Sequence, residues 1–128
     1  MRYLILLITL IFSNNLLASD WVQINTGDHV TVYVDKSSIT FDKKIGKAWV
    51  MYSYENPIKN YNGIEYNQAK DLGKYNCSNF TVAYLQSISY MGTEVISSYT
   101  YPLNQIKYTD IVPDSYAELI SKFVCNTK

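Results

Sequence analysis

Few residues of this 128-residue chain could carry out acid–base chemistry, and their spacing does not bring them together. His29 is the single histidine, and it stands beside Asp28 after a Thr26-Gly27 turn signal. Histidine is the most frequent general base near neutral pH. Neighbouring residues of a strand point to opposite faces of the sheet, so this spacing argues against a catalytic His–Asp pair. We therefore interpret His29 as an exposed turn residue.

The other residue types that enzymes use show no recognisable arrangement either. The 11 acidic residues contain no pair or loop with the spacing of glycosidase or calcium sites. The sequence also lacks phosphate-binding glycine loops, serine-nucleophile elbows and histidine metal motifs. Two glycosylation triplets, at 76–78 and 79–81, are of a kind that occurs often by chance. We predict no catalytic, cofactor-binding or metal-binding residue, and no enzymatic activity.

The two cysteines, Cys77 and Cys125, are the remaining candidates for chemistry. A zinc site would need four ligands, which two thiols and one distant histidine do not supply. In an exported chain an even number of cysteines indicates a disulfide, and two cysteines allow one pairing. We therefore predict a Cys77–Cys125 disulfide, which the chain-entropy model credits with about 4 kcal/mol of stabilisation.

The N-terminal segment indicates that the chain is exported. Arg2 precedes an apolar run over residues 4–12, and a small residue follows a short polar stretch. This order is typical of a secretory signal peptide, and the run is shorter than the ~20 residues that span a bilayer. We predict that residues 1–18 are removed and that residues 19–128 form one domain. Ser19 stands where lipid attachment would need a cysteine, so we expect no lipid anchor and no stable membrane insertion after cleavage.

The charge balance argues against a nucleic-acid partner. The whole chain has 11 Lys+Arg and 11 Asp+Glu, and its only arginine lies in the predicted signal peptide. The mature chain would therefore have no guanidinium group for bidentate phosphate recognition. Without a positive surface there is also little to displace phosphate counterions, so we expect no nucleic-acid binding.

Alternation of apolar and polar residues predicts a mainly β protein. The clearest predicted strands cover residues 29–35, 47–54, 78–91 (with Phe80 on its apolar face) and 93–101. Weaker strand signals cover residues 21–25, 39–41, 66–75 and 105–108. Short connections, with Gly92 as a turn residue, favour an antiparallel meander.

One helix is predicted near the C-terminus. Pro113-Asp114 ends the preceding segment, and Ser115 with Glu118 has the spacing of a capping box, in which each side chain bonds the other residue's amide. The apolar residues that follow form one broad stripe at helical spacing: Tyr116, Ala117, Leu119, Ile120, Phe123 and Val124. The helix can therefore pack on the sheet in an α+β, mainly β fold. Cys125 would tie its end to Cys77 at the start of the longest strand.

Tyrosine is unusually frequent, with 13 residues, and all but Tyr3 lie in the predicted mature chain. Two explanations stay open, because tyrosine half-buries well on a sheet and also suits protein interfaces. Residues 56–66 separate two predicted strands, and we expect them to form a mobile surface loop. Within that loop we predict four residues that bind a protein ligand: Pro57, Lys59, Tyr61 and Tyr66.

Several residues follow an order that resembles one known family. They are Trp21, Tyr33-Val34-Asp35, Ser38-Ile39, Gly46, Trp49, Asn76-Cys77, Tyr90-Met91-Gly92, Pro113-Asp114-Ser115 and Val124-Cys125. The ordered set resembles the surface-adhesin protein E family over essentially the whole mature chain. The resemblance implies a small exported bacterial domain, with an antiparallel sheet of about six strands. It also implies a C-terminal helix tied to the concave side by the disulfide.

The resemblance further implies a binding function. The founding adhesin binds host matrix and serum proteins such as laminin, vitronectin and plasminogen, so we expect an exported, non-enzymatic binding protein in the periplasm, at the cell surface or secreted. That adhesin is lipid-anchored, whereas this chain has Ser19 and no mature arginine, and no ligand-contact residue carries over. A homo-oligomer is compatible with these features. The alternative is a periplasmic inhibitor or immunity-type protein that blocks an enzyme with a protruding loop.

Overall fold

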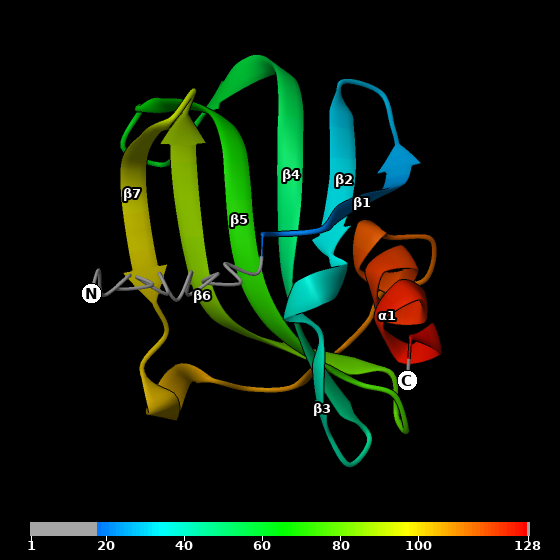
Figure 1. Cartoon of the computed structure of the whole chain (residues 1–128). Coiled ribbons are helices and arrows are strands. Elements are labelled where there is room, and N and C mark those ends of the chain that lie inside the picture. The colour runs from blue at the N-terminus through cyan, green and yellow to red at the C-terminus, as the bar shows by residue number, and fades with distance from the viewer. Residues whose placement is uncertain (1–17, 128) are drawn as a thin grey trace, which may run out of the picture.

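Alternating apolar and polar side chains build one antiparallel sheet in the computed structural model, which describes residues 18–127 (Figure 1). The predicted signal peptide lies outside the described residues, except for Ala18. The strands are β1 (Trp21–Thr26), β2 (Val30–Asp35), β3 (Thr40–Asp42), β4 (Ile45–Lys59), β5 (Glu65–Asn76), β6 (Thr81–Met91), β7 (Glu94–Thr100) and β8 (Thr109–Asp110). The helices are the short 3₁₀ segments η1 (Lys36–Ser38) and η2 (Leu103–Gln105), and α1 (Tyr116–Asn126).

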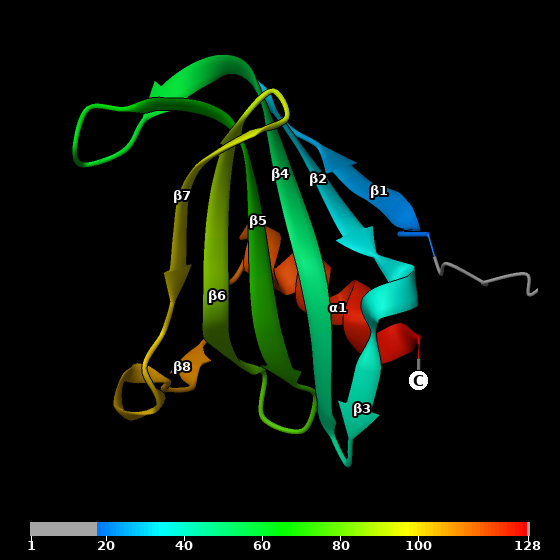
Figure 2. The ribbon, with the colours of Figure 1, turned by 60° about the vertical axis from the view of Figure 1, so that its left-hand side comes forward.

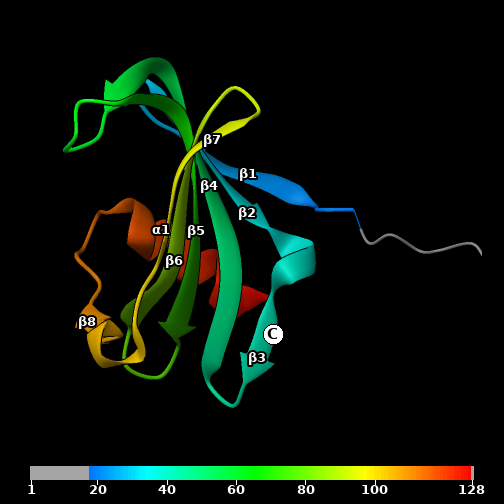
Figure 3. The same cartoon turned by 90° about the vertical axis from the view of Figure 1, so that its left-hand side faces the viewer.

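Six strands follow one another across the sheet in the order β1-β2-β4-β5-β6-β7, with β3 added beside β4 and β8 beside β6. Each of these neighbours is antiparallel, which confirms the predicted meander; β3 matches the strand predicted over residues 39–41, and β8 was not predicted. Register shifts interrupt the pairing at several points, one of them between Ser53 and Ile58 on β4. Such bulges bend a sheet, and Figure 3 shows the far end of the β4–β5 hairpin arching toward the side that carries α1.

The core lies between α1 and the strands beneath it. Its buried members are Val32, Val34, Ala48, Val50, Tyr75, Val82, Ile120 and Val124. Gly46 allows the helix to come this close, because a Cβ atom there would lie 2.6 Å from Val124 Cγ1. Glycine at this position of β4 therefore serves helix packing rather than a turn. Among the described residues, no helix is long and apolar enough to cross a membrane.

The start of α1 is capped almost as the sequence predicts. Ser115 Oγ accepts a hydrogen bond from the amide of Glu118 at 3.3 Å. Glu118 Oε2, in return, accepts from the amide of Asp114 at 2.6 Å, one residue earlier than a capping box requires. Lys122 Nζ lies 2.8 Å from the other carboxylate oxygen, and this hydrogen bond lowers the pKa of Glu118. The prediction of a capped helix is confirmed, with a shifted return bond.

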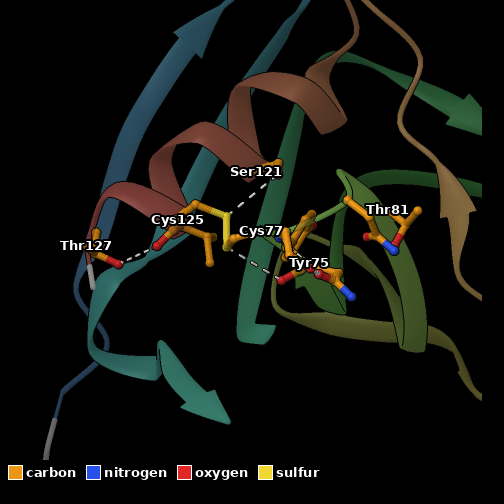
Figure 4. The surroundings of a disulfide bond; sticks show 10 residues. Tyr75, Cys77, Thr81, Ser121, Cys125 and Thr127 are labelled. Carbon is orange, nitrogen blue, oxygen red and sulfur yellow. Dashed lines mark hydrogen bonds between the residues drawn. A yellow bond between two sulfur atoms is a disulfide. The ribbon is translucent and has the colours of Figure 1, made fainter. Parts of the chain in front are cut away.

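The buried face of α1 differs from the predicted stripe. Ile120 and Val124 are buried as predicted, but Leu119 is 42% exposed and Ser121 is buried instead. Figure 4 shows why: Ser121 lies one turn before Cys125 on the side that faces the disulfide, with Ser121 Oγ 3.9 Å from Cys125 Sγ. The bond to Cys77 therefore orients the helix with Ser121 toward the sheet.

The predicted Cys77–Cys125 disulfide is confirmed, with the two Cα atoms 5.8 Å apart. Cys77 lies in the tight turn between β5 and β6, not at the start of the longest strand, which is the fifteen-residue β4. Asn76 holds this turn, because its Oδ1 accepts from the amide and the hydroxyl of Ser78 at 3.0 and 2.7 Å. The disulfide thus fixes the last turn of α1 to a short, well-bonded connection.

Two other strand predictions need correction. The strand predicted from residue 78 begins at Thr81, and Phe80 stands in the turn with φ +54° and 62% of its surface exposed. The strand predicted over residues 105–108 is absent from the described chain, where η2 and an irregular segment occupy this region. The amide of Gln105 bonds the carbonyl of Pro102 at 2.8 Å, so a helical turn starts there in place of the strand.

Asp35 and its partners explain part of the residue order on which the family resemblance depends. Asp35 Oδ1 accepts hydrogen bonds from the amides of Asp20 and Ser37 at 2.9 and 3.1 Å. Ser38 Oγ donates to the Asp35 carbonyl at 2.7 Å and accepts from the amide of Trp49 at 3.0 Å. These bonds join the residue before β1, the end of β2, η1 and β4, so the residues act as scaffold.

Candidate binding surface

The predicted binding loop is a hairpin rather than a mobile loop. Pro57 and Lys59 belong to β4, Tyr66 belongs to β5, and of the four predicted residues only Tyr61 lies in the turn over residues 60–64. β4 and β5 pair out to Lys59 and Glu65, beyond the register shift that contains Pro57. Proline lacks an amide hydrogen and is tolerated at such bulges, so it does not end the strand here.

The turn itself is held by Asn60. Its side-chain oxygen accepts hydrogen bonds from the amides of Asn62 and Ile64, both at 2.9 Å. Gly63, with φ +77°, supplies the left-handed backbone that the turn needs. The turn is therefore conformationally defined, which reduces the entropy that a partner would have to remove on binding.

Three apolar side chains are exposed at this end of the hairpin. We call Ile58, Tyr61 and Ile64 the hairpin tip; Tyr61 is 97% exposed, and both isoleucines are also exposed. Figure 2 shows this end of β4 and β5 projecting beyond the neighbouring strands. Exposed apolar side chains that gather on a projecting, ordered element are typical of protein-binding surfaces.

A second aromatic group follows the concave side of the sheet. We call it the tyrosine face: Tyr52, Tyr54, Tyr66, Tyr84, Tyr101 and Tyr116, each half-buried. Tyr52 and Tyr54 continue the alternation of Ala48 and Val50, and so point to the side that carries α1. The rings of Tyr54 and Tyr66 meet edge to face, 5.9 Å between centroids, so this surface continues toward the hairpin tip.

Asp71 is the charged residue of the tyrosine face. It pairs with Val50 of β4 on one side and with Ser87 of β6 on the other. Ser87 Oγ donates a hydrogen bond to Asp71 Oδ1 at 2.7 Å. Burial raises the pKa of the Asp71 carboxyl, and the bond from Ser87 opposes this only in part. Within residues 18–127, Asp71 forms no ion pair.

The phenols around Asp71 are held in their neutral form. Burial raises the pKa of Tyr52, Tyr54 and Tyr84, and the nearby phenols and Asp71 raise it further. Tyr75 is fully buried next to them, and its ring lies over Gly73, where a Cβ atom would be 3.0 Å from it. At physiological pH the face therefore presents aromatic rings, hydroxyl groups and one carboxylate.

Replacing Asp71 with asparagine is expected to stabilise the protein more at neutral pH than at acidic pH. A raised pKa in the folded state means that folding loses stability as the pH rises from 3.8, the ordinary value, through the folded pKa. The asparagine side chain would keep the bond from Ser87 without a charge. Urea unfolding of both proteins at pH 3 and pH 7 checks this: the advantage of D71N should be larger at pH 7. Equal differences at the two pH values would contradict it.

The opposite face of the same strand holds a cation. Lys70 Nζ lies 5.6 Å from the ring centroid of Trp21 and 4.7 Å from that of Tyr90. Trp49 and Ile88 line the same shallow hollow. Because consecutive strand residues point to opposite sides, Lys70 and Asp71 face away from each other. On the convex side, Lys70 of the chain itself therefore already supplies a cation to the aromatic rings.

The structure agrees with the interpretation of His29 as an exposed turn residue. His29 is exposed, with φ +66°, and its Nδ1 lies 2.9 Å from Glu55 Oε2 rather than meeting Asp28. Neither the role of Asp71 nor the grouping of the tyrosines was predicted from the sequence. One signal was present, because an acidic residue interrupts the predicted strand over residues 66–75.

Comparison with known proteins identifies the family. The sequence model described as Surface-adhesin protein E matches residues 21–126. Crystal form II of Haemophilus influenzae protein E is similar to this chain with 14% identity and a TM-score of 0.62, covering 87% of this chain and 91% of that one. Another H. influenzae protein E structure has 14% identity, a TM-score of 0.60 and 87% coverage of both chains.

Protein E from non-typeable H. influenzae has 12% identity and a TM-score of 0.58, covering 86% of this chain and 78% of that one. A search of curated proteins finds no match. At these identities the structural likeness establishes the fold. The sequence match, which spans nearly all of the described residues, establishes more: the chain belongs to the surface-adhesin protein E family.

Proposed function

We propose that residues 19–128 form an exported, non-enzymatic adhesin that binds a host extracellular-matrix or serum protein. The observation that carries this proposal is the family match over residues 21–126, since the family is one of surface adhesins. Residues 1–18 would act as the signal peptide and be removed. Because Ser19 offers no thiol for lipid attachment, the mature protein would reach the surface or the medium without an anchor.

The hairpin tip and the tyrosine face supply the surface for this function. The tip exposes Tyr61 on a turn fixed by Asn60, and aromatic anchors of this kind dominate binding energies at protein interfaces. The tyrosine face adds polar and aromatic contact area with few rotatable bonds. The predicted residues Pro57, Lys59 and Tyr66 flank the tip and would shape the contact.

The test measures binding of residues 19–128 to immobilised laminin and vitronectin at physiological salt. Saturable binding to either protein is expected, and Tyr61→Ser should weaken it about tenfold, the loss typical of an aromatic anchor. Tyr108→Ser changes another exposed tyrosine, away from the hairpin, and should leave the affinity unchanged. No saturable binding to either protein would remove the adhesin proposal.

A projecting hairpin with a fixed turn also suits a second function, that of a periplasmic inhibitor or immunity-type protein. Such a tip could block the cleft of an enzyme by inserting Tyr61. Cell fractionation separates the two functions, because an adhesin would be found at the surface or in the medium. An inhibitor would be retained in the periplasm and would co-purify with an enzyme from the producer's own envelope.

A further inference from the structure

Two adjacent residues of β5 stand in aromatic surroundings on opposite faces of the sheet, and aromatic rings stabilise the charge of only one of them, the cation Lys70. Lys70 lies against the rings of Trp21 and Tyr90. Asp71 lies among the tyrosines of the concave face, where Ser87 is its single hydrogen-bond partner within the described residues. The chain thus places a lysine among aromatic rings on one side, and a carboxylate without a cation on the other.

The groups around Asp71 come from three strands. Tyr52 and Tyr54 lie on β4, and Tyr84 lies on β6 opposite Gly73, two residues from Asp71. Tyr52 pairs with Ala69, two residues from Asp71 on the same side of β5, and, in addition to burial, the charge of Asp71 raises the pKa of all three phenols. Asp71 and these tyrosines are half-buried, so each keeps part of its surface exposed to solvent.

The chemistry of these groups selects a cation. An anion would meet the like charge of Asp71, which has no ion-pair partner among the described residues. A calcium ion would need six or more oxygen ligands, whereas this face has one carboxylate. An ammonium or guanidinium group can bond the carboxylate and lie against the phenol rings, the two interactions that stabilise organic cations in proteins.

We propose that the tyrosine face binds a lysine or arginine side chain of the protein partner, with Asp71 as its counter-ion and Tyr52, Tyr54 and Tyr84 as its aromatic lining. The inference rests on the proposed function, because it assigns the cation to a protein ligand. It adds the chemistry of one contact: the partner must present a basic side chain to the part of the sheet around Asp71.

The first experiment uses small probes and needs no natural ligand. Isotope-labelled residues 19–128 are titrated with Nα-acetyl-lysine amide and Nα-acetyl-arginine amide, and amide chemical shifts are recorded by NMR. Saturable changes are expected near residues 52–54, 69–71 and 84–87. A dissociation constant on the order of 1–10 mM is expected, as for one charged bond plus cation–π contacts. Nα,Nε-diacetyl-lysine amide, which has no charge, should cause none of these changes.

Asp71→Asn should weaken the binding of both probes at least tenfold while the rest of the spectrum stays that of a folded chain. Asp42→Asn removes the same charge from an exposed position on β3 and should leave the affinity unchanged. Probe binding that survives Asp71→Asn, or that Asp42→Asn weakens equally, would overturn the inference. Tyr54→Leu gives a second measure, since it removes one ring and keeps the carboxylate; unchanged affinity would also count against the proposal.

The second experiment distinguishes this inference from the proposed function. If the wild-type chain binds laminin or vitronectin, Asp71→Asn should weaken that binding at least tenfold and Asp42→Asn should not. Equal affinities of wild type and Asp71→Asn would overturn the inference and leave the adhesin function intact. Probe binding at Asp71 without any binding to matrix proteins would support the cation site and overturn the adhesin function.

Discussion

Replacing Cys125 with alanine should lower the free energy of unfolding by about 3–4 kcal/mol, the value expected for a disulfide that closes a loop of this length. The bond joins residues 48 apart and fixes the last turn of α1 to the β5–β6 turn. A helix of eleven residues is marginal by itself and depends on its contacts with the sheet. Urea unfolding gives the stability, and amide exchange shows that α1 loses protection before the strands do.

The matched control for this experiment is the double variant Cys77→Ala/Cys125→Ala, which leaves no free thiol. It should show a loss similar to that of the single variant, because both lack the same cross-link. Full exchange protection of residues 116–124 in either variant would contradict the expectation. In that case the buried face of α1 alone would be sufficient to hold the helix on the sheet.

Replacing Ile120 with alanine should cost about 2–5 kcal/mol of stability, as for other large-to-small changes in a well-packed core. Ile120 is 0% exposed and belongs to the buried cluster between α1 and the sheet. The measurement is the free energy of unfolding in urea at neutral pH. A reduced helix signal before global unfolding would show that the loss begins at α1.

Leu119 provides the control within the same helix. Leu119 directly precedes Ile120, and leucine is an isomer of isoleucine. Because Leu119 is exposed, Leu119→Ala should change the free energy of unfolding by no more than about 0.5 kcal/mol. Similar losses of stability for Ile120→Ala and Leu119→Ala would mean that α1 does not pack on the sheet through the face described above. The comparison also tests the corrected helix face, since the sequence stripe placed both residues on the buried side.

Much of the fold could be predicted from the sequence because its signals are local. Alternation identified β2 and the central part of β4, and Ser115 with Glu118 identified the start of α1. The disulfide followed from cysteine number and export. The errors lie where contacts between distant parts of the chain determine the structure. Proline usually ends a strand, but Pro57 lies in a bulge, and β4 continues to Lys59 because it pairs with β5 there.

The candidate site was less accessible to prediction, since it depends on register. Asp71 faces Val50 and Ser87 only because β4, β5 and β6 pair as they do, and a slip of one residue would turn it to the convex side. The burial of Ser121 likewise depends on the position of Cys77, which lies in a turn distant in the sequence. Periodicity assigns a residue to a face but does not say which neighbours share it.

The position of the disulfide has a consequence for resistance to proteolysis. Cys77 and Cys125 enclose β6, β7, β8 and most of α1, and with them the exposed stretch around Leu103. A protease that cuts once within this stretch produces two fragments that stay covalently joined through sulfur. The nicked molecule would migrate as one species in non-reducing electrophoresis and would keep every strand beside its neighbour. The disulfide therefore prevents a single cut in this stretch from releasing the segment that carries α1.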